Sequence, residues 1–508
     1  MTALIALPIL LPLFGAALGV GLGRSRAAQR LISVITLGTV AATSAVLLVR
    51  VDSDGATAVQ AGGWQAPLGI TLVADRLAAI MLLVAMLMLL AVLLFAIGQP
   101  GAESHHVGFH PVYLVLAAGI AMAFLTGDLF NLFVAFEVTL MASYVLITLG
   151  GRPDQVRSGM TYIVISLIAS TLFLVALALV YAATGTVNLA DLSAKVADLP
   201  DGVRSALAVL LIVVFGIKAA IFPLFFWLPD SYPTAPTPVT AVFAGLLTKV
   251  GVYAIIRTFT LLFDGDAGYT GPIVAGIAIL TMVTGVLGAA AHYDVRRILS
   301  FHIISQIGYM LFGIAIATPL AVAGSILYVI HHIVVKANLF LIAGVIRAAG
   351  GSFELKEIGG LYRSLPWLGV LFLIPALSLA GLPPLSGFWS KFTVIKASLD
   401  AGHIALAASG LLVGLLTLYS MLKIWNEAFW KAAPERSQTA MTAWRQAGGA
   451  RILMLTPIVS LAAVTLTIGL FAEPFVDYSM RAAGQLLDKS IYIDAVFGPA
   501  QTIAEISR

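Results

Sequence analysis

The sequence predicts an all-α protein that crosses a membrane about fourteen times. Three observations favour this fold class. The chain of 508 residues is 60% hydrophobic and only 10% charged, whereas soluble domains carry about 25% charged residues. Its apolar stretches are long enough to cross a bilayer, which takes about 20 residues in a helix. Its basic residues gather in alternate loops, as in multi-pass membrane proteins.

The first span is predicted at the N-terminus, where MTALIALPILLPLFGAALGVGLG is apolar and is followed, not preceded, by arginines. A secretory signal has the opposite order, so we expect this helix to be retained. The fourth and fifth spans are separated by very little, and Asp128 is a suitable N-cap for the fifth. The predicted spans are 2–22, 29–49, 76–97, 111–126, 128–149, 159–183, 205–226, 238–263, 271–291, 300–317, 322–347, 367–399, 404–430 and 451–475.

Prolines interrupt the seventh and twelfth spans. Proline removes a backbone donor, and irregular backbone at membrane depth is tolerated only inside protein or beside a watery cavity. The breaks lie five spans apart, so equivalent helices run in opposite directions, which predicts two inverted five-helix repeats. The predicted division is 1–110 for helices 1–3, 111–263 for the first repeat (helices 4–8), 271–430 for the second repeat (helices 9–13) and 431–508 for helix 14 and the tail.

Loop charges predict the orientation. Loops on one side carry most of the arginines and lysines, among them Arg152, Arg296 and Lys431, while opposite loops are richer in aspartate, such as Asp198 and Asp264. The positive-inside rule therefore places the basic loops in the cytoplasm and both termini on the extracytoplasmic side.

Charged residues within the predicted spans are the main functional signal. A charge at bilayer depth costs between about 2.5 and 17 kcal/mol, so such residues are functional candidates. Burial favours the neutral form of a lysine, which can then exchange a proton near neutral pH. The alternatives are a structural ion pair for the acid and the first lysine, and lysines that reach toward the membrane surface. The predicted proton-transfer residues are Glu137, Lys218, Lys249, His332, Lys336 and Lys391.

Five further residues are secondary candidates. His332 and Lys336 are four residues apart and share one helical face, and a hydroxyl one turn earlier could extend that path. Ser166 and Ser170, by contrast, are interpreted as ordinary polar residues of helix packing. The secondary candidates are Tyr328, His331, Asp75, Asp230 and His302.

Several function classes are disfavoured. The chain has no cysteine, so iron–sulfur ligation and disulfides are excluded. No phosphate-binding loop or dinucleotide fingerprint is present, and two adjacent histidines lack a third ligand, so neither a cofactor nor a metal nor an enzymatic site is expected. The net charge of +4 is spread over loops and gives no case for nucleic-acid binding.

Four motifs resemble a known family. They are GIKAAIFPLFFWLPDSYPTAPTPVTAVFAGLLTKVGVY, DVRRILSFHIISQIGYM, HHIVVKANLFLIAG and GLPPLSGFWSKF. Together they resemble the proton-conducting antiporter-like subunits of NADH:quinone oxidoreductase (complex I) and of the multisubunit Mrp-type Na⁺/H⁺ antiporters. The stretch FLTGDLFNLFVAFEVTLMASYVLITLGG is most similar to the D-type subunits of the Mrp antiporters.

The resemblance implies fourteen helices and a midplane line of charged residues. The buried charges of the family match the six predicted proton-transfer residues. One position departs from the family, because a histidine one turn before His332 is Tyr328 here, which implies a shorter or water-filled proton path. The resemblance also implies a transporter subunit in a bacterial plasma membrane. The implied partners are the A, B, C, E, F and G type subunits and membrane lipids. Protons are the implied transported ion, and Na⁺ is a second candidate for transport. The alternatives are a proton-pumping subunit of complex I or of a membrane-bound hydrogenase, and a non-conducting scaffold.

Overall fold

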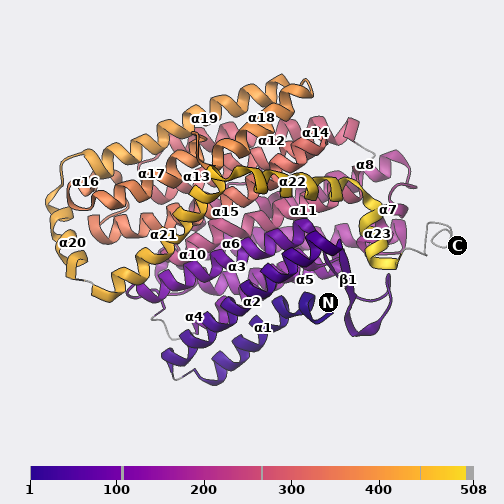
Figure 1. Ribbon diagram of the computed structural model, residues 1–508, viewed down its shortest axis with the longest axis horizontal. Coiled ribbons are helices and arrows are strands. Elements are labelled where there is room, and N and C mark those ends of the chain that lie inside the picture. Colours follow the sequence, from indigo (N-terminus) through magenta and orange to yellow (C-terminus); the bar gives the residue numbers. More distant parts are fainter. Residues whose placement is uncertain (1, 24, 104–107, 265–266, 447, 499–508) are drawn as a thin grey trace.

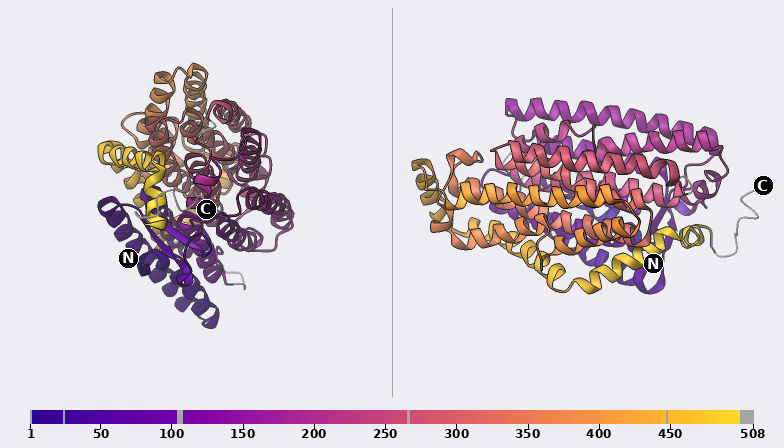
Figure 2. Two further views of the ribbon diagram at one scale, coloured as in Figure 1. Left: turned by 90° about the vertical axis from the view of Figure 1, so that its right-hand side faces the viewer. Right: turned by 90° about the horizontal axis from the view of Figure 1, so that it is seen from above.

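The computed structural model describes residues 2–23, 25–103, 108–264, 267–446 and 448–498. Long helices run side by side in one bundle (Figure 1), and the end-on view in Figure 2 looks down their axes. The start of α1 (Thr2–Gly21) and the helix α23 (Lys489–Phe497) lie at one end of the bundle, and α20 (Glu435–Gln446) lies at the opposite end. The first and last described helices thus share one end, which agrees with an even number of membrane crossings.

The predicted all-α membrane fold is confirmed. Within the described ranges, twelve helices are long and apolar enough to cross a membrane, and two shorter apolar helices, α4 (Phe109–Leu125) and α17 (Pro366–Ala380), occupy the places of the predicted fourth and twelfth spans. The other spanning helices are α1 (Thr2–Gly21), α2 (Arg26–Asp54), α3 (Arg76–Gly98), α5 (Leu129–Thr148), α6 (Pro153–Thr184), α8 (Asp201–Ala219), α10 (Thr237–Val242) with α11 (Thr248–Leu261), α12 (Ala267–Ala291), α13 (Val295–Met310) with α14 (Phe312–Ile316), α15 (Pro319–Gly350), α19 (Ile404–Trp425) and α21 (Gly448–Leu470).

Aspartates begin several of these helices. Asp128 caps α5 as predicted, because its carboxylate accepts a 2.8 Å hydrogen bond from the Asn131 N–H. Asp75 caps α3 through the Ala78 N–H at 2.8 Å. Each cap satisfies a backbone donor that the first helical turn leaves free.

Both predicted breaks are present. The seventh span is a helix only to Ala219, not to residue 226, because Ala220 adopts a left-handed backbone (φ 61°) and proline follows at Pro223. The chain then turns into α9 (Trp227–Ser231) and η2 (Tyr232–Thr234). In the twelfth span, α17 ends before Gly381 (φ 95°), and α18 (Ser386–Asp400) continues after a turn.

The eighth span contains a feature that the sequence did not predict. A wide π-helical turn, η3 (Phe243–Leu247), separates α10 from α11. Such turns are rare and often occur at functional sites. Beyond it, a Cβ added at Gly251 would lie 2.6 Å from the backbone nitrogen of Ala219, so α11 and α8 approach closely beside Lys218.

Short elements cover the bundle end that holds the termini. They are the antiparallel strands β1 (Thr57–Gln60) and β2 (Thr71–Ala74), η1 (Ala61–Gly63), α7 (Leu189–Lys195) and α23 (Lys489–Phe497). The helix α22 (Ala472–Leu487) runs along the side of the bundle and precedes α23. The remaining elements are η5 (Leu355–Glu357), α16 (Leu361–Ser364) and η6 (Asn426–Trp430).

The C-terminal helix α22 crosses the bundle surface and packs against α15, α11 and α3 (Figure 1). Arg481 of α22 pairs with Asp52 at 3.0 Å, and Arg76 pairs with the same carboxylate at 2.7 Å. These contacts fix α22 to the helix ends beneath it.

Candidate functional site: a buried line of charged residues

Glu137 and Lys218 are connected through a serine. Ser170 of α6 donates a hydrogen bond to the carboxylate of Glu137 on α5. Lys218, in the last turn of α8, donates to the Ser170 hydroxyl and to the Ser166 carbonyl, each at 3.4 Å. In the described part of the chain the two charged groups form no direct ion pair. The hydroxyl of Ser170 therefore accepts from the ammonium and donates to the carboxylate.

The break after α8 gives the Lys218 ammonium favourable surroundings. Carbonyl groups at a helix C-terminus carry partial negative charge, which favours a cation in the last turn. The Lys218 ammonium also lies 5.7 Å from the centre of the Phe136 ring, a favourable cation–π distance. Trp227, just beyond the break, donates to the Ile217 carbonyl at 3.1 Å and fixes the returning chain.

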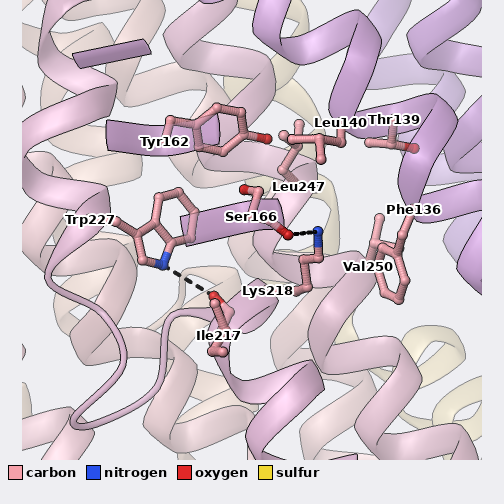
Figure 3. A pocket seen from close by; sticks show the side chains of 10 residues that line it. All are labelled: Phe136, Thr139, Leu140, Tyr162, Ser166, Ile217, Lys218, Trp227, Leu247 and Val250. Carbon is pink, nitrogen blue, oxygen red and sulfur yellow. Dashed lines mark hydrogen bonds between the residues drawn. The ribbon is translucent and has the colours of Figure 1, made fainter. Parts of the chain in front are cut away.

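A small cavity lies beside Lys218 (Figure 3). Its volume of about 30 Å³ exceeds the 10–15 Å³ or so that one water requires. Polar side chains of Tyr162, Ser166 and Thr139 line it, and the buried Thr139 hydroxyl has no hydrogen-bond partner within the described structure. Leu247 and Val250, which flank Lys249 in sequence, close another side. The cavity is thus suited to a water between Lys218 and the eighth span.

Lys249 is fully buried at the start of α11. Its ammonium donates to the Ala244 carbonyl at 2.5 Å and to the Thr248 hydroxyl at 3.1 Å. The first acceptor lies within the π-helical turn, so this turn supplies a partner to a lysine that forms no ion pair in the described chain. The second predicted repeat begins beyond it.

Lys336 and His332 continue the line on α15. Lys336 is fully buried and donates to the Leu299 carbonyl of α13 at 3.0 Å. The charges of Lys249 and Lys336 both act on His332, which places the three groups in one electrostatic cluster. Both ring nitrogens of His332 and of His302 are buried without a partner in the described structure. Buried polar groups are ordinarily satisfied by protein or ordered water, so this seam is suited to water.

An aromatic pair leads toward Lys391. Tyr328 donates to the side-chain oxygen of Gln306 and stacks on Tyr309 with ring centres 5.0 Å apart. The Lys391 ammonium lies 4.8 Å from the centre of the Tyr309 ring and donates to the Ala380 carbonyl at 3.0 Å. Ala380 is the last residue of α17, so each broken helix ends beside a buried lysine.

The other secondary candidates differ in how close they lie to this line. His331 lies beside it, because its ring meets the Tyr328 ring edge-on with centres 5.6 Å apart and its Nδ1 lies 2.8 Å from the Ser386 hydroxyl. Asp75 forms a buried ion pair with Arg257 at 2.5 Å, at the bundle end that holds the termini. Asp230 is exposed and lies 3.8 Å from Arg297.

The structure adds polar residues that the sequence did not single out. Ser170, Thr139 and Gln306 all contribute to the line or its cavity. Serine and threonine are ordinary residues of membrane-helix packing, and an uncharged glutamine gives a weaker signal than a charge, so only their placement distinguishes these residues. In the described residues, no group of three or more His, Cys, Asp or Glu side chains is placed to hold a metal ion.

Comparisons with known proteins support one family. The family model described as "NADH:quinone oxidoreductase/Mrp antiporter, TM" matches residues 126–417. The D subunit of a Na⁺/H⁺ antiporter from Alkalihalophilus pseudofirmus is 48% identical over 497 residues, covering 98% of this chain and 99% of that protein. A protein of the same name from Bacillus subtilis is 39% identical over the same shares of both chains. A chain in the solved structure of an Mrp complex from Dietzia sp. DQ12-45-1b is 35% identical, with a TM-score of 0.90, covering 98% of this chain and 100% of that one.

Proposed function

The chain belongs to the NADH:quinone oxidoreductase/Mrp antiporter transmembrane family, and we propose that it is the proton-translocating, D-type subunit of a multisubunit Na⁺/H⁺ antiporter. The resemblance expected from the motifs is confirmed. Members related to complex I share the fold as relatives, whereas the curated relatives described above carry the antiporter name over nearly their full length. The chain is a multi-pass membrane subunit of a larger complex.

The connection of Glu137, Ser170 and Lys218 carries this proposal. An ammonium that donates to a hydroxyl, which in turn donates to a carboxylate, can shift one proton along each hydrogen bond. Lys218 then becomes neutral and Glu137 becomes protonated, with Ser170 restored after its hydroxyl rotates. This converts a half-buried pair of opposite charges into two neutral groups, which lowers the cost of keeping the pair away from water. The cavity beside Lys218 gives a water access to the newly neutral amine.

The remaining buried bases extend the path. Lys249 is the next acceptor, and His332 and Lys336 follow in its electrostatic cluster. A neutral imidazole can accept a proton on one nitrogen and release one from the other, so His332 suits a relay. Lys391 is the last buried base, at the break between α17 and α18. These residues define two halves that correspond to the two predicted inverted repeats.

The partners and location follow from the same assignment. The A, B, C, E, F and G type subunits would complete the complex in a bacterial plasma membrane, with both termini on the extracytoplasmic side. Sodium requires hard oxygen ligands, and Glu137 is the one acid that the sequence places near the middle of a predicted span. We therefore assign sodium handling to other subunits or to subunit boundaries.

Replacing Ser170 by alanine tests this function most specifically. The complex carrying Ser170→Ala should assemble, but Na⁺-dependent proton movement in inverted vesicles should fall by about tenfold or more, since a hydrogen bond to a charged group contributes about 1.5–3 kcal/mol. Thr171→Ala is the matched control, because Thr171 is exposed and its hydroxyl bonds only to Leu167 in its own helix. Wild-type transport by assembled Ser170→Ala complex would refute a path through this hydroxyl.

A further inference from the structure

A polar stripe on α11 connects Lys249 to the end of the bundle where both termini lie. Lys249, Tyr253 and Arg257 follow one another at four-residue intervals, so they share one helical face. All three are buried. Next to Arg257, toward the terminal end of the bundle, lie Asp75 at the start of α3 and then the C-terminal helices α22 and α23. A polar stripe of this kind would offer protons an entry to Lys249 unless something in it blocks them.

In the described part of the stripe Arg257 acts only as a donor, both to Asp75 and to Tyr253. The guanidinium of Arg257 donates to the Tyr253 hydroxyl at 3.1 Å, and Tyr253 donates to the Phe124 carbonyl at 2.6 Å. A proton arriving from the terminal end would need an acceptor at Arg257, but a guanidinium has only donors and does not lose its proton in proteins. The chain of hydrogen bonds therefore cannot pass a proton inward.

Asp75 holds this cation in place. Its two carboxylate oxygens accept from Arg257 at 2.5 and 2.8 Å, and one of them also caps α3 through the Ala78 N–H. The side chains are only 3% and 5% exposed. The guanidinium also lies between the rings of Tyr253 and Tyr492, 5.4 and 5.3 Å from their centres. A charge held so firmly keeps a fixed position in the stripe.

The C-terminal helices close the space above the pair. A cavity of about 10 Å³, close to the size of one water, is lined by Asp75, Arg257, Gln485, Lys489 and Tyr492. Gln485 of α22 accepts from the Arg76 backbone N–H at 2.8 Å, and Lys489 of α23 pairs with Asp264. The cavity thus leaves room for about one water beside the pair, on its terminal side.

We propose that Arg257, fixed by Asp75 and roofed by α22 and α23, is an electrostatic barrier that stops protons from passing between this end of the bundle and Lys249. A fixed cation in a narrow polar passage repels protons, as arginines do in water channels. The inference rests on Lys249 being part of the proton path. It adds a second task for this chain, which is to prevent an uncoupled leak.

Passive proton leak in liposomes containing the whole complex tests this barrier. A K⁺ diffusion potential is applied without Na⁺, and internal pH is followed with a dye. The double variant Asp75→Asn/Arg257→Gln, which removes both charges together, should leak several-fold faster than wild type. The matched control Asp54→Asn/Arg50→Gln removes an exposed ion pair at the end of α2 and should leave the leak unchanged.

A second variant separates an electrostatic barrier from a steric plug. Tyr492→Ala widens the cavity but leaves the guanidinium, so its leak should match wild type. A leak in Tyr492→Ala, or equal leaks in the two double variants, would overturn the proposal, as would a wild-type leak in assembled Asp75→Asn/Arg257→Gln complex. The leak is measured without Na⁺, so it is scored independently of antiport. If the proposed function is wrong, Ser170→Ala will instead leave Na⁺-dependent transport unchanged.

Discussion

Asp75 and Asp52 show how burial decides the value of an ion pair. Asp75 pairs with Arg257 where both side chains are nearly inaccessible, whereas Asp52 pairs with Arg481 where the side chains are 32% and 47% exposed. Breaking a buried pair leaves an uncompensated charge, which typically costs about 3–5 kcal/mol. An exposed pair contributes less than about 1 kcal/mol.

We therefore expect Asp75→Asn to destabilise the purified complex by roughly 3–5 kcal/mol and Asp52→Asn by much less. Thermal unfolding of the two variants, measured side by side, checks the difference. Equal unfolding midpoints for the two variants would mean that water screens the Asp75–Arg257 pair, which would contradict its buried geometry.

Among individual residues, the charged ones could be predicted from the sequence, but the hydrogen bonds that connect them could not. Glu137, Lys218, Lys249 and Lys336 stand out because charge is rare in apolar spans, and the structure places them on helices of one bundle, with Lys249 and Lys336 fully buried. Their roles in proton transfer stay predictions. Ser170 could not be singled out, since its role depends on α6 presenting it between two other helices.

Among the elements, the two broken helices were predictable because proline has a local effect on its own backbone. The wide turn η3 was not, because no residue type requires a π-helical turn in Phe243–Leu247. The C-terminal helices α22 and α23 were also missed, since their amphipathic sequence follows the last apolar span without a distinct signal. Features that depend on contacts between distant parts of the chain cannot be predicted from local sequence.

The close approach of α8 and α11 yields a prediction for these elements. A Cβ at Gly251 would meet the Ala219 backbone at 2.6 Å, and backbone atoms cannot move aside as a flexible side chain can. Gly251→Ala should therefore destabilise the complex by about 1–3 kcal/mol, as overpacking does, and should reduce transport by separating Lys218 from Lys249.

Gly276→Ala is the control, because the added methyl group meets no atom within 4 Å on α12. Thermal unfolding and transport of both variants give the comparison. Unchanged stability and transport in Gly251→Ala would mean that the two helices are free to separate at this point.

For the whole molecule, orientation is the main prediction. The start of α1 and the helix α23 share one bundle end with α7 and the strands, while α20 lies at the other (Figure 1). Because the chain contains no cysteine, single cysteines can be introduced without a background. Cysteines at the exposed positions Arg157 and Glu435 should be labelled only from the cytoplasm, and one at Asp198 only from outside. Labelling of positions 157 and 198 from the same side would contradict the topology.

The central claim is that Glu137 and Lys218 act as one proton-transfer unit. Na⁺-dependent proton movement should be measured in vesicles containing the assembled complex with Glu137→Gln, Lys218→Ala or both changes. Lys396→Ala is the control, since Lys396 is exposed and pairs with Asp400 at 2.5 Å. Groups that act as a unit give non-additive losses, so each single variant should abolish transport and the double variant should be no worse. Wild-type transport in either single variant, with the complex intact, would contradict the account.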